Sequence, residues 1–158
     1  MNKPGFGLLY PWGFLILFFI SACDTNRVYE EYHGMKNQSW DIADTVSFEV
    51  SLSQDYQVAS ILRVKYNNNY DYHNLYVRYI LRDSTGNMME NDLMDLQLFD
   101  QKSGRPLGDG FGNSYTKVDT LPLKKLTGGN KASVQFVQYM RSEALNGIES
   151  VGIKISKE

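Results

Sequence analysis

Residues 45–52 read Thr-Val-Ser-Phe-Glu-Val-Ser-Leu, and this stretch decides the fold class of the 158-residue chain. An apolar residue occurs at every second position, with hydroxyl-bearing or acidic residues between. Because side chains point alternately to the two faces of a β-strand, this alternation predicts a strand with one buried face and one wet face. In a helix the same apolar residues would be spread around the whole circumference, so a helical interpretation fails.

The same alternation recurs along the rest of the chain, and turn-forming Asn, Asp, Ser and Gly residues separate the runs. We predict about eight strands, at residues 28–32, 45–52, 58–66, 75–82, 93–99, 115–121, 132–139 and 150–155. Residues 141–146 are expected to form one helical turn that ends at Gly147. No stretch can supply the crossover helices of a parallel sheet. The chain is therefore predicted to be all-β, an antiparallel β-sandwich of the immunoglobulin-like or jelly-roll-like kind.

The first 22 residues differ from everything that follows. Lys3 is the one charged residue there, residues 6–20 are almost all apolar, and Ser21 and Ala22 precede Cys23. A basic start, a short apolar run and small residues are typical of a secretory signal peptide. The apolar run is about 15 residues long, short of the ~20 that span a bilayer. We therefore predict a cleaved signal peptide in place of a retained transmembrane helix.

The ending Ile-Ser-Ala-Cys at residues 20–23 resembles the bacterial lipobox. That resemblance implies a diacylglycerol on the Cys23 thiol, cleavage before Cys23, and acylation of the new amino group, for example with palmitate. Several acyl chains anchor a protein firmly where a single one does not. The expected organisation is a signal peptide at residues 1–22, a lipidated N-terminus with a short spacer at residues 23–26, and one β-sandwich domain at residues 27–158.

Charge and cysteine content exclude several classes of protein. Removing the first 22 of 158 residues leaves a mature chain of 136, and its net charge changes from −2 to −3. That balance gives no general attraction to nucleic acid, so no nucleic-acid partner is predicted. Cys23 is the single cysteine, so an intramolecular disulfide is excluded. A chain of this length can bury a core without disulfides or metals.

No constellation of catalytic residues stands out. The two histidines, His33 and His73, are far apart, and no Gly-x-Ser-x-Gly or HExxH motif occurs. Glycines 108, 110 and 112 do not have the spacing of a phosphate-binding loop, and a tight turn is the preferred interpretation. Three aspartates offer oxygen ligands for calcium but do not match EF-hand spacing: Asp95, Asp100 and Asp109. We therefore predict no enzyme, no metal site and no cofactor beyond the covalent lipid.

Tyrosine is the most unusual part of the composition, with 11 residues. Five of them fall within residues 66–79, interleaved with asparagines. Exposed aromatic and Arg side chains are typical of a surface that binds protein or sugar, although β-propensity and core filling explain many tyrosines equally well. Tyr70 and Tyr72 fall in an expected turn, and Tyr76 shares the polar face of its strand with Arg78. These four residues are candidates for a ligand surface.

Several motifs extend over nearly the whole mature chain, beginning with Cys23 and residues 28–33, and continuing through Trp40 and residues 96–112. The most distinctive of them is Gln-Tyr-Met-Arg at residues 138–141 followed by residues 145–153. Together these motifs resemble the GldH family of gliding-motility lipoproteins from Bacteroidetes.

The resemblance implies a non-enzymatic lipoprotein of the cell envelope, held in the outer membrane and facing the periplasm. It also implies an accessory or assembly role beside other envelope proteins of the gliding and type IX secretion apparatus. The motif positions are candidates for an interface or for folding: Tyr29, Tyr32, His33, Trp40, Asp109 and Arg141. The alternative hypothesis is a lipid-anchored glycan-binding module, in which Tyr70, Tyr72 and Tyr76 stack on sugar rings.

Overall fold

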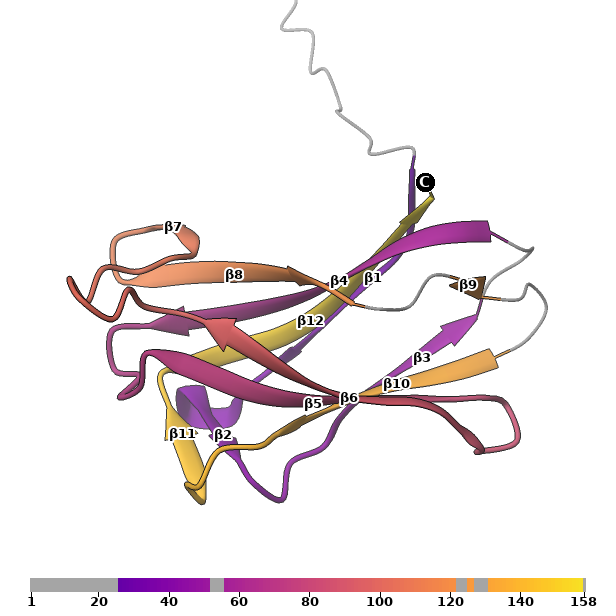
Figure 1. Ribbon diagram of the computed structural model, residues 1–158, viewed down its shortest axis with the longest axis horizontal. Helices are drawn as coiled ribbons and strands as arrows, with labels where there is room; N and C mark the ends of the chain where they lie inside the picture. The colour runs from indigo at the N-terminus through magenta and orange to yellow at the C-terminus, as the bar shows by residue number, and fades with distance from the viewer. Residues whose placement is uncertain (1–25, 52–55, 122–124, 127–130, 158) are drawn as a thin grey trace, which may run out of the picture.

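The computed structural model describes residues 26–51, 56–121, 125–126 and 131–157 (Figure 1). The predicted signal peptide and Cys23 lie outside the described residues, so cleavage and lipidation stay predictions. Among the described residues, regular structure is almost entirely antiparallel β, which confirms the predicted fold class. No helix in the described ranges is long and apolar enough to cross a membrane.

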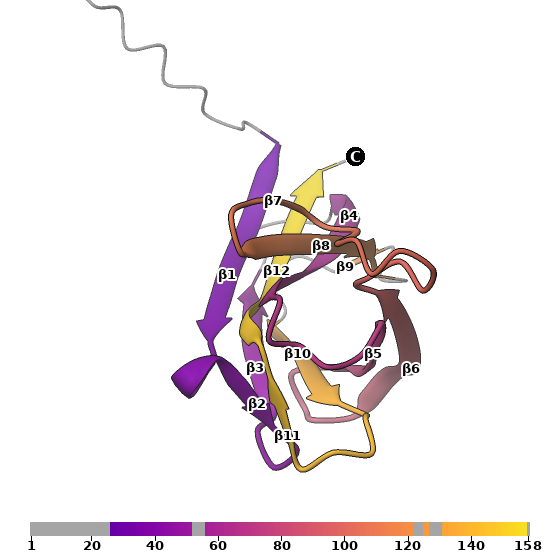
Figure 2. The same cartoon turned by 90° about the vertical axis from the view of Figure 1, so that its left-hand side faces the viewer.

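Two sheets are stacked in a sandwich, with the six-stranded sheet above the four-stranded sheet in Figure 1. The larger sheet has the order β1 (Arg27–Gly34), β12 (Ile148–Lys157), β4 (Tyr56–Asn67), β8 (Ser114–Thr120), β7 (Asp109–Phe111), and β9 (Lys125–Leu126) also pairs with β4. The smaller sheet has the order β3 (Val46–Ser51), β10 (Lys131–Gln138), β5 (Asn74–Arg82), β6 (Met88–Gln97). A separate ribbon pairs β2 (Ser39–Asp41), which follows the 3-10 turn η1 (Lys36–Gln38), with β11 (Ala144–Asn146) (Figure 2).

The described residues form twelve strands, more than the eight predicted. Eight of them are six or more residues long, and each overlaps one of the predicted runs. The largest departure is β6, which begins at Met88 where the predicted strand begins at residue 93. The other four, β2, β7, β9 and β11, have two or three residues, too few for an alternation to be recognised. The helical turn expected at residues 141–146 was wrong. This segment contains β11, because Leu145 is buried opposite Trp40 of β2 and an extended backbone is needed to pair there.

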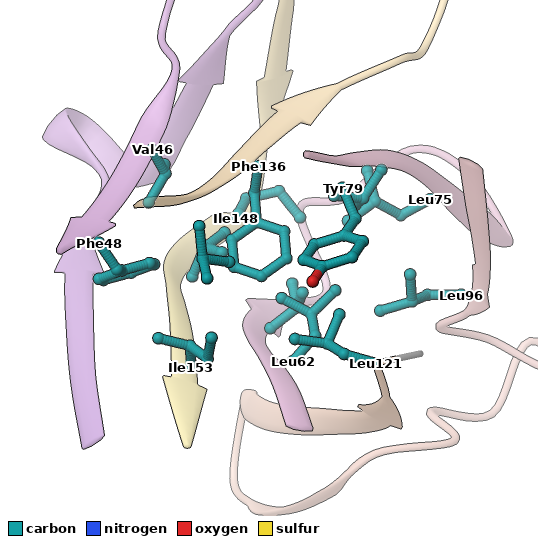
Figure 3. Close-up of a cluster of buried hydrophobic side chains, with 14 of the residues drawn as sticks. Val46, Phe48, Leu62, Leu75, Tyr79, Leu96, Leu121, Phe136, Ile148 and Ile153 are labelled. Atoms are coloured by element: carbon teal, nitrogen blue, oxygen red, sulfur yellow. The ribbon is translucent and has the colours of Figure 1, made fainter. Parts of the chain in front are cut away.

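The core lies between the sheets and is built from the apolar positions of the alternating runs (Figure 3). In β3, Phe48 is buried and the neighbouring Glu49 is exposed, as the opening stretch predicts. The Phe136 ring meets the rings of Phe48 and Tyr79 with centroid distances of 6.1 and 6.0 Å. These ring contacts join three neighbouring strands of the four-stranded sheet. Each fully buried side chain of this size contributes about 1.5–3 kcal/mol of transfer free energy, and the shared burial of the inner faces of both sheets holds the two layers together.

Candidate functional site

Two of the residues predicted to form a ligand surface belong to the core. Trp40 has no exposed surface, and its indole N–H donates to the carbonyl oxygen of Asp44 over 2.9 Å. Tyr70 is 5% exposed, and its hydroxyl donates to the carbonyl oxygen of Asn74 over 2.9 Å. Burial raises the pKa of the Tyr70 hydroxyl, so it stays a neutral donor. The expectation of an exposed Tyr70 was wrong, because the turn that carries it packs against Gly147.

A groove of about 520 Å³ brings several exposed side chains together on the outer face of the four-stranded sheet. Three of its lining residues were predicted as ligand residues: Tyr72, Tyr76 and Arg141. Three more were not singled out as ligand residues: Leu93, Tyr139 and Met140. We call this surface, together with the adjacent Arg78, the aromatic groove.

Strand alternation points Tyr76 into the aromatic groove, because its neighbours Leu75 and Val77 are buried on the inner face of β5. Tyr139 directly follows β10, and its backbone N–H donates to the carbonyl oxygen of Tyr76 over 2.8 Å. The backbone N–H of Tyr76 in turn lies 3.4 Å from the sulfur of Met140. The two tyrosines therefore sit on adjoining, hydrogen-bonded backbone.

Arg78 fixes the ring of Tyr139. Its guanidinium carbon lies 4.3 Å from the ring centroid, and its Nη1 donates to Oδ1 of Asn91 over 3.2 Å. A cation–π contact at an exposed site contributes about 0.5–1 kcal/mol, so it orients the ring without burying it. Tyr139 remains 53% exposed and Leu93 50% exposed, which leaves about half of their surface for a partner to cover.

Tyr32 and Asp109 meet in a different place, on the outer face of the six-stranded sheet. They line a hollow of about 640 Å³ with Arg63, Lys65, Gly110, Thr116 and Ser150, which we call the polar hollow. The Tyr32 ring lies over Gly152, where a Cβ would collide with it. Its hydroxyl donates to Glu30 over 2.6 Å and accepts from Nη1 of Arg63 over 2.8 Å. Burial and the bond to Glu30 raise the pKa of Tyr32, although Arg63 acts in the opposite direction.

The remaining candidate residues do not line either surface. Tyr29 is partly buried against the core, and its hydroxyl donates to the carboxylate of Glu31. His33 is exposed near the end of β1. The carboxylate of Asp100 accepts hydrogen bonds within its own turn, and that of Asp95 accepts from Asn74 and Gln97. Within the ranges that the structure describes, no three His, Cys, Asp or Glu residues are grouped to hold a metal ion.

Glu149 ties three strands together beside the polar hollow. Its carboxylate accepts from Nδ2 of Asn67 over 3.0 Å and from Oγ of Ser114 over 2.9 Å, and it pairs with Nζ of Lys65 at 3.2 Å. Burial alone would raise the pKa of Glu149, but the bonds from Asn67, Ser114 and Lys65 outweigh it, so the pKa lies below its ordinary value. The ionised form is therefore the form that the fold stabilises.

The lowered pKa predicts a loss of stability in acid. Because the folded-state pKa is below the unfolded value of 4.5, the contribution is present above that value and is lost as the pH falls through the folded pKa. We expect Glu149→Gln to lower the free energy of unfolding by about 1–2 kcal/mol near neutral pH and to flatten its acid dependence. Urea unfolding across the acid range measures both effects. Exposed Glu143→Gln removes the same charge as a control, and equal acid dependence in both variants would contradict the prediction.

The fold and its groove define the class of protein: a β-sandwich that presents a half-exposed aromatic and Arg surface on rigid strands, a composition typical of binding surfaces. The chain belongs to the GldH lipoprotein family, whose profile matches residues 27–155. The resemblance inferred from the motifs is thereby confirmed. Membership implies a gliding-motility-associated lipoprotein held at a membrane of the cell envelope.

Two relatives agree with this assignment, and one solved structure has a distant likeness to the chain. A gliding motility lipoprotein GldH homolog of Christiangramia forsetii is 30% identical over 153 residues, covering 91% of each chain. The gliding motility lipoprotein GldH of Flavobacterium johnsoniae is 24% identical over 159 residues, covering 92% of this chain and 96% of its own. A family 35 carbohydrate binding module from Clostridium thermocellum covers 78% of this chain and 90% of its own, with 12% identity and a TM-score of 0.42. At that level of similarity its ligand says nothing about this chain.

Proposed function

We propose that this protein is a non-enzymatic accessory or assembly component of the gliding-motility and type IX secretion machinery. In this proposal a lipid on Cys23 anchors it in the outer membrane, where it faces the periplasm, and the aromatic groove docks on another envelope protein. The observation that carries the proposal is the groove, which holds four large side chains in half-exposed positions: Tyr72, Tyr76, Leu93 and Tyr139.

Physical chemistry favours such a groove as a docking site. Tyr and Arg dominate the energetically important residues of protein interfaces, because they offer a large contact area and a polar end. The Arg78 contact holds the Tyr139 ring before a partner arrives, and the backbone bond from Tyr139 to Tyr76 fixes the chain that carries both tyrosines. Little side-chain entropy is then lost on binding. A lipid anchor adds a raised local concentration at the membrane surface.

A glycan-binding module is the second candidate, and the exposed rings of Tyr72 and Tyr76 favour it. Sugar rings stack on flat aromatic faces, and both side chains line the same groove. Tyr70 is buried and cannot take part in stacking. A glycan array with the purified protein separates the two functions, because sugar binding that is abolished by Tyr72→Ala would favour the glycan-binding module.

Co-purification from native envelopes tests the docking function. We expect Tyr139→Ala to reduce recovery of the partner protein about tenfold or more, because a central aromatic anchor is removed. The control is Met89→Ala, since Met89 is 60% exposed on β6 and does not line the aromatic groove. Both variants should keep wild-type stability. Wild-type recovery with Tyr139→Ala would argue against docking through the groove.

The anchor is tested separately by fatty-acid labelling. Cys23→Ala should abolish incorporation of labelled fatty acid, because the acceptor thiol is lost. It should also release the protein from membranes. Persistent labelling of this variant would show that the lipid is carried elsewhere and would remove the anchoring half of the proposal.

A further inference from the structure

Phe111 is the most exposed large apolar side chain that the structure describes, at 96%. It ends β7, a strand whose three residues are all exposed. Leu107, close before it in the chain, is 46% exposed. Burial of an aromatic side chain is one of the larger favourable contributions to folding or binding, and the fold makes no use of it here.

The β7–β8 hairpin, which carries Phe111, is held in a defined conformation by its glycines and by one hydrogen bond. Gly112 has a φ of +67°, as a two-residue hairpin turn with glycine at its first central position requires. A Cβ on Gly110 would collide with the carbonyl oxygen of Ser114, so the two strands approach as closely as only glycine allows. The Tyr115 hydroxyl donates to the carbonyl oxygen of Gly112 over 2.8 Å. The exposure of Phe111 is therefore built into an ordered element.

Strand register places Phe111 on the outer face of the six-stranded sheet. It lies opposite Ser114, whose hydroxyl binds Glu149 on that face. Directly opposite residues of an antiparallel pair point to the same side of the sheet. By the same register, Tyr32 lies opposite Gly152 and reaches Arg63 on this face, and it is 48% exposed. Two exposed aromatic residues therefore share one surface with the polar hollow.

The proposed anchor joins the chain beside this surface. Cys23 precedes the first residue of β1, Arg27, by four positions, so the connection spans at most about 14 Å. In both views the beginning of β1 and the β7–β8 hairpin lie toward the top, and β5 and β10 lie below them (Figures 1 and 2). The register places Arg27 beside the beginning of β4 and Phe111 beside its end, so the two lie at opposite ends of the six-stranded sheet. A lipid on Cys23 and membrane contact at Phe111 would together lay this sheet against the bilayer and leave the aromatic groove, on the other sheet, away from it.

The charges of this face fit a bilayer of zwitterionic lipids. Arg63 pairs with Glu30 at 3.1 Å and Lys65 pairs with Glu149 at 3.2 Å, so these charges balance. Exposed Asp109 adds a negative charge, and Lys154 and Arg27, which both act on Glu30, add positive ones. The face therefore has no large excess of either sign and little attraction to anionic headgroups. Aromatic side chains are enriched at the headgroup level of bilayers, where the ring reaches apolar acyl chains while the neighbouring polar groups stay among the headgroups.

We propose that the outer face of the six-stranded sheet rests on the bilayer that holds the anchor, with Phe111 inserted at the boundary between headgroups and acyl chains. This inference rests on the proposed lipid at Cys23. It assigns Phe111 and Tyr32 to a membrane-contact surface, and it leaves the aromatic groove facing the proteins of the periplasm.

A fluorophore at position 111 tests this orientation. The mature acylated protein is prepared as Phe111→Cys, labelled with an environment-sensitive dye and reconstituted in phosphatidylcholine vesicles. Cys23 is the single natural cysteine and its sulfur is blocked by the lipid, so the new thiol is labelled selectively. We expect the emission to shift to shorter wavelength and to be quenched by lipids with brominated acyl chains. Met89→Cys, on β6 of the other sheet, should show neither effect.

The other outcomes are distinguishable. Unquenched emission at position 111, from acylated protein that floats with the vesicles, would overturn the proposal and leave the anchor intact. If the dye emission shifts in native envelopes but is not quenched by brominated lipids in pure vesicles, Phe111 contacts a protein partner. That result would also overturn the proposal. Failure to float would refute the lipid anchor itself, and this proposal with it. Phe111→Ser should retain wild-type stability, because its side chain has no buried contacts to lose.

Discussion

Replacing Trp40 by alanine is expected to lower the free energy of unfolding by about 3–5 kcal/mol. The side chain is completely buried, and its indole N–H is paired with the carbonyl oxygen of Asp44. Its strand, β2, pairs with β11, where Leu145 lies directly opposite and is also buried. Alanine would leave a cavity beside this ribbon and an unpaired carbonyl group. Since small domains are stable by only about 5–15 kcal/mol, this is the largest effect that we expect from a single substitution.

Urea unfolding of the mature chain measures this effect. Ile42→Ala is the control, because Ile42 lies two positions away and is 48% exposed. It should cost well under about 1 kcal/mol. Equal costs for the two variants would show that the β2–β11 ribbon contributes little to the stability of the sandwich.

Gly147→Ala is expected to lower the free energy of unfolding by about 2–4 kcal/mol. Gly147 has a φ of +82°, which an L side chain adopts with strain. An added Cβ would also collide with the backbone nitrogen of Tyr70 and lie 2.8 Å from the carbonyl carbon of Asn69. Both contacts are with backbone, so the turn at residues 67–70 must move. That shift would carry Tyr72 with it, and we expect weaker binding at the aromatic groove as a second consequence.

The matched control is Gly34→Ala. A Cβ at Gly34 meets no atom within 4 Å, and its φ is not positive. The free energies of unfolding of the two variants, measured with heat or urea, should therefore differ by most of the loss predicted for Gly147→Ala. A Gly147→Ala protein as stable as Gly34→Ala would show that the turn can move without loss of stability.

The fold was predictable from the sequence because strand burial is a local property. The alternation at residues 45–52 and at β5 shows which side chains face the core without any knowledge of strand pairing. What the alternation lacks is the partner of each strand. The pairing of β2 with β11 joins segments about a hundred residues apart, and three-residue strands have too few positions to show a period.

The aromatic groove was only half predictable for the same reason. Tyr72 and Tyr76 were identified from their local setting, but Tyr139 joins them through the pairing of β10 with β5. The family motif at residues 138–141 was the one signal that pointed to Tyr139. Tyr70 was misplaced, because a turn residue is normally exposed and Gly147, which lets this turn pack closely, is distant in sequence.

Strand β6 pairs only with β5 within the described part of the chain, so its other side is a sheet edge. Proteins anchored in one membrane are confined to a thin layer, so the open sheet edges of neighbouring copies meet often. Such edges can pair with one another through their free backbone groups. Two exposed carboxylates are spaced along this edge strand, at Asp92 and Asp95. Two β6 edges brought together would confront these negative charges with one another, which costs free energy. The acidic edge strand therefore hinders neighbouring copies of this lipoprotein, crowded in one membrane, from pairing edge to edge into continuous sheets.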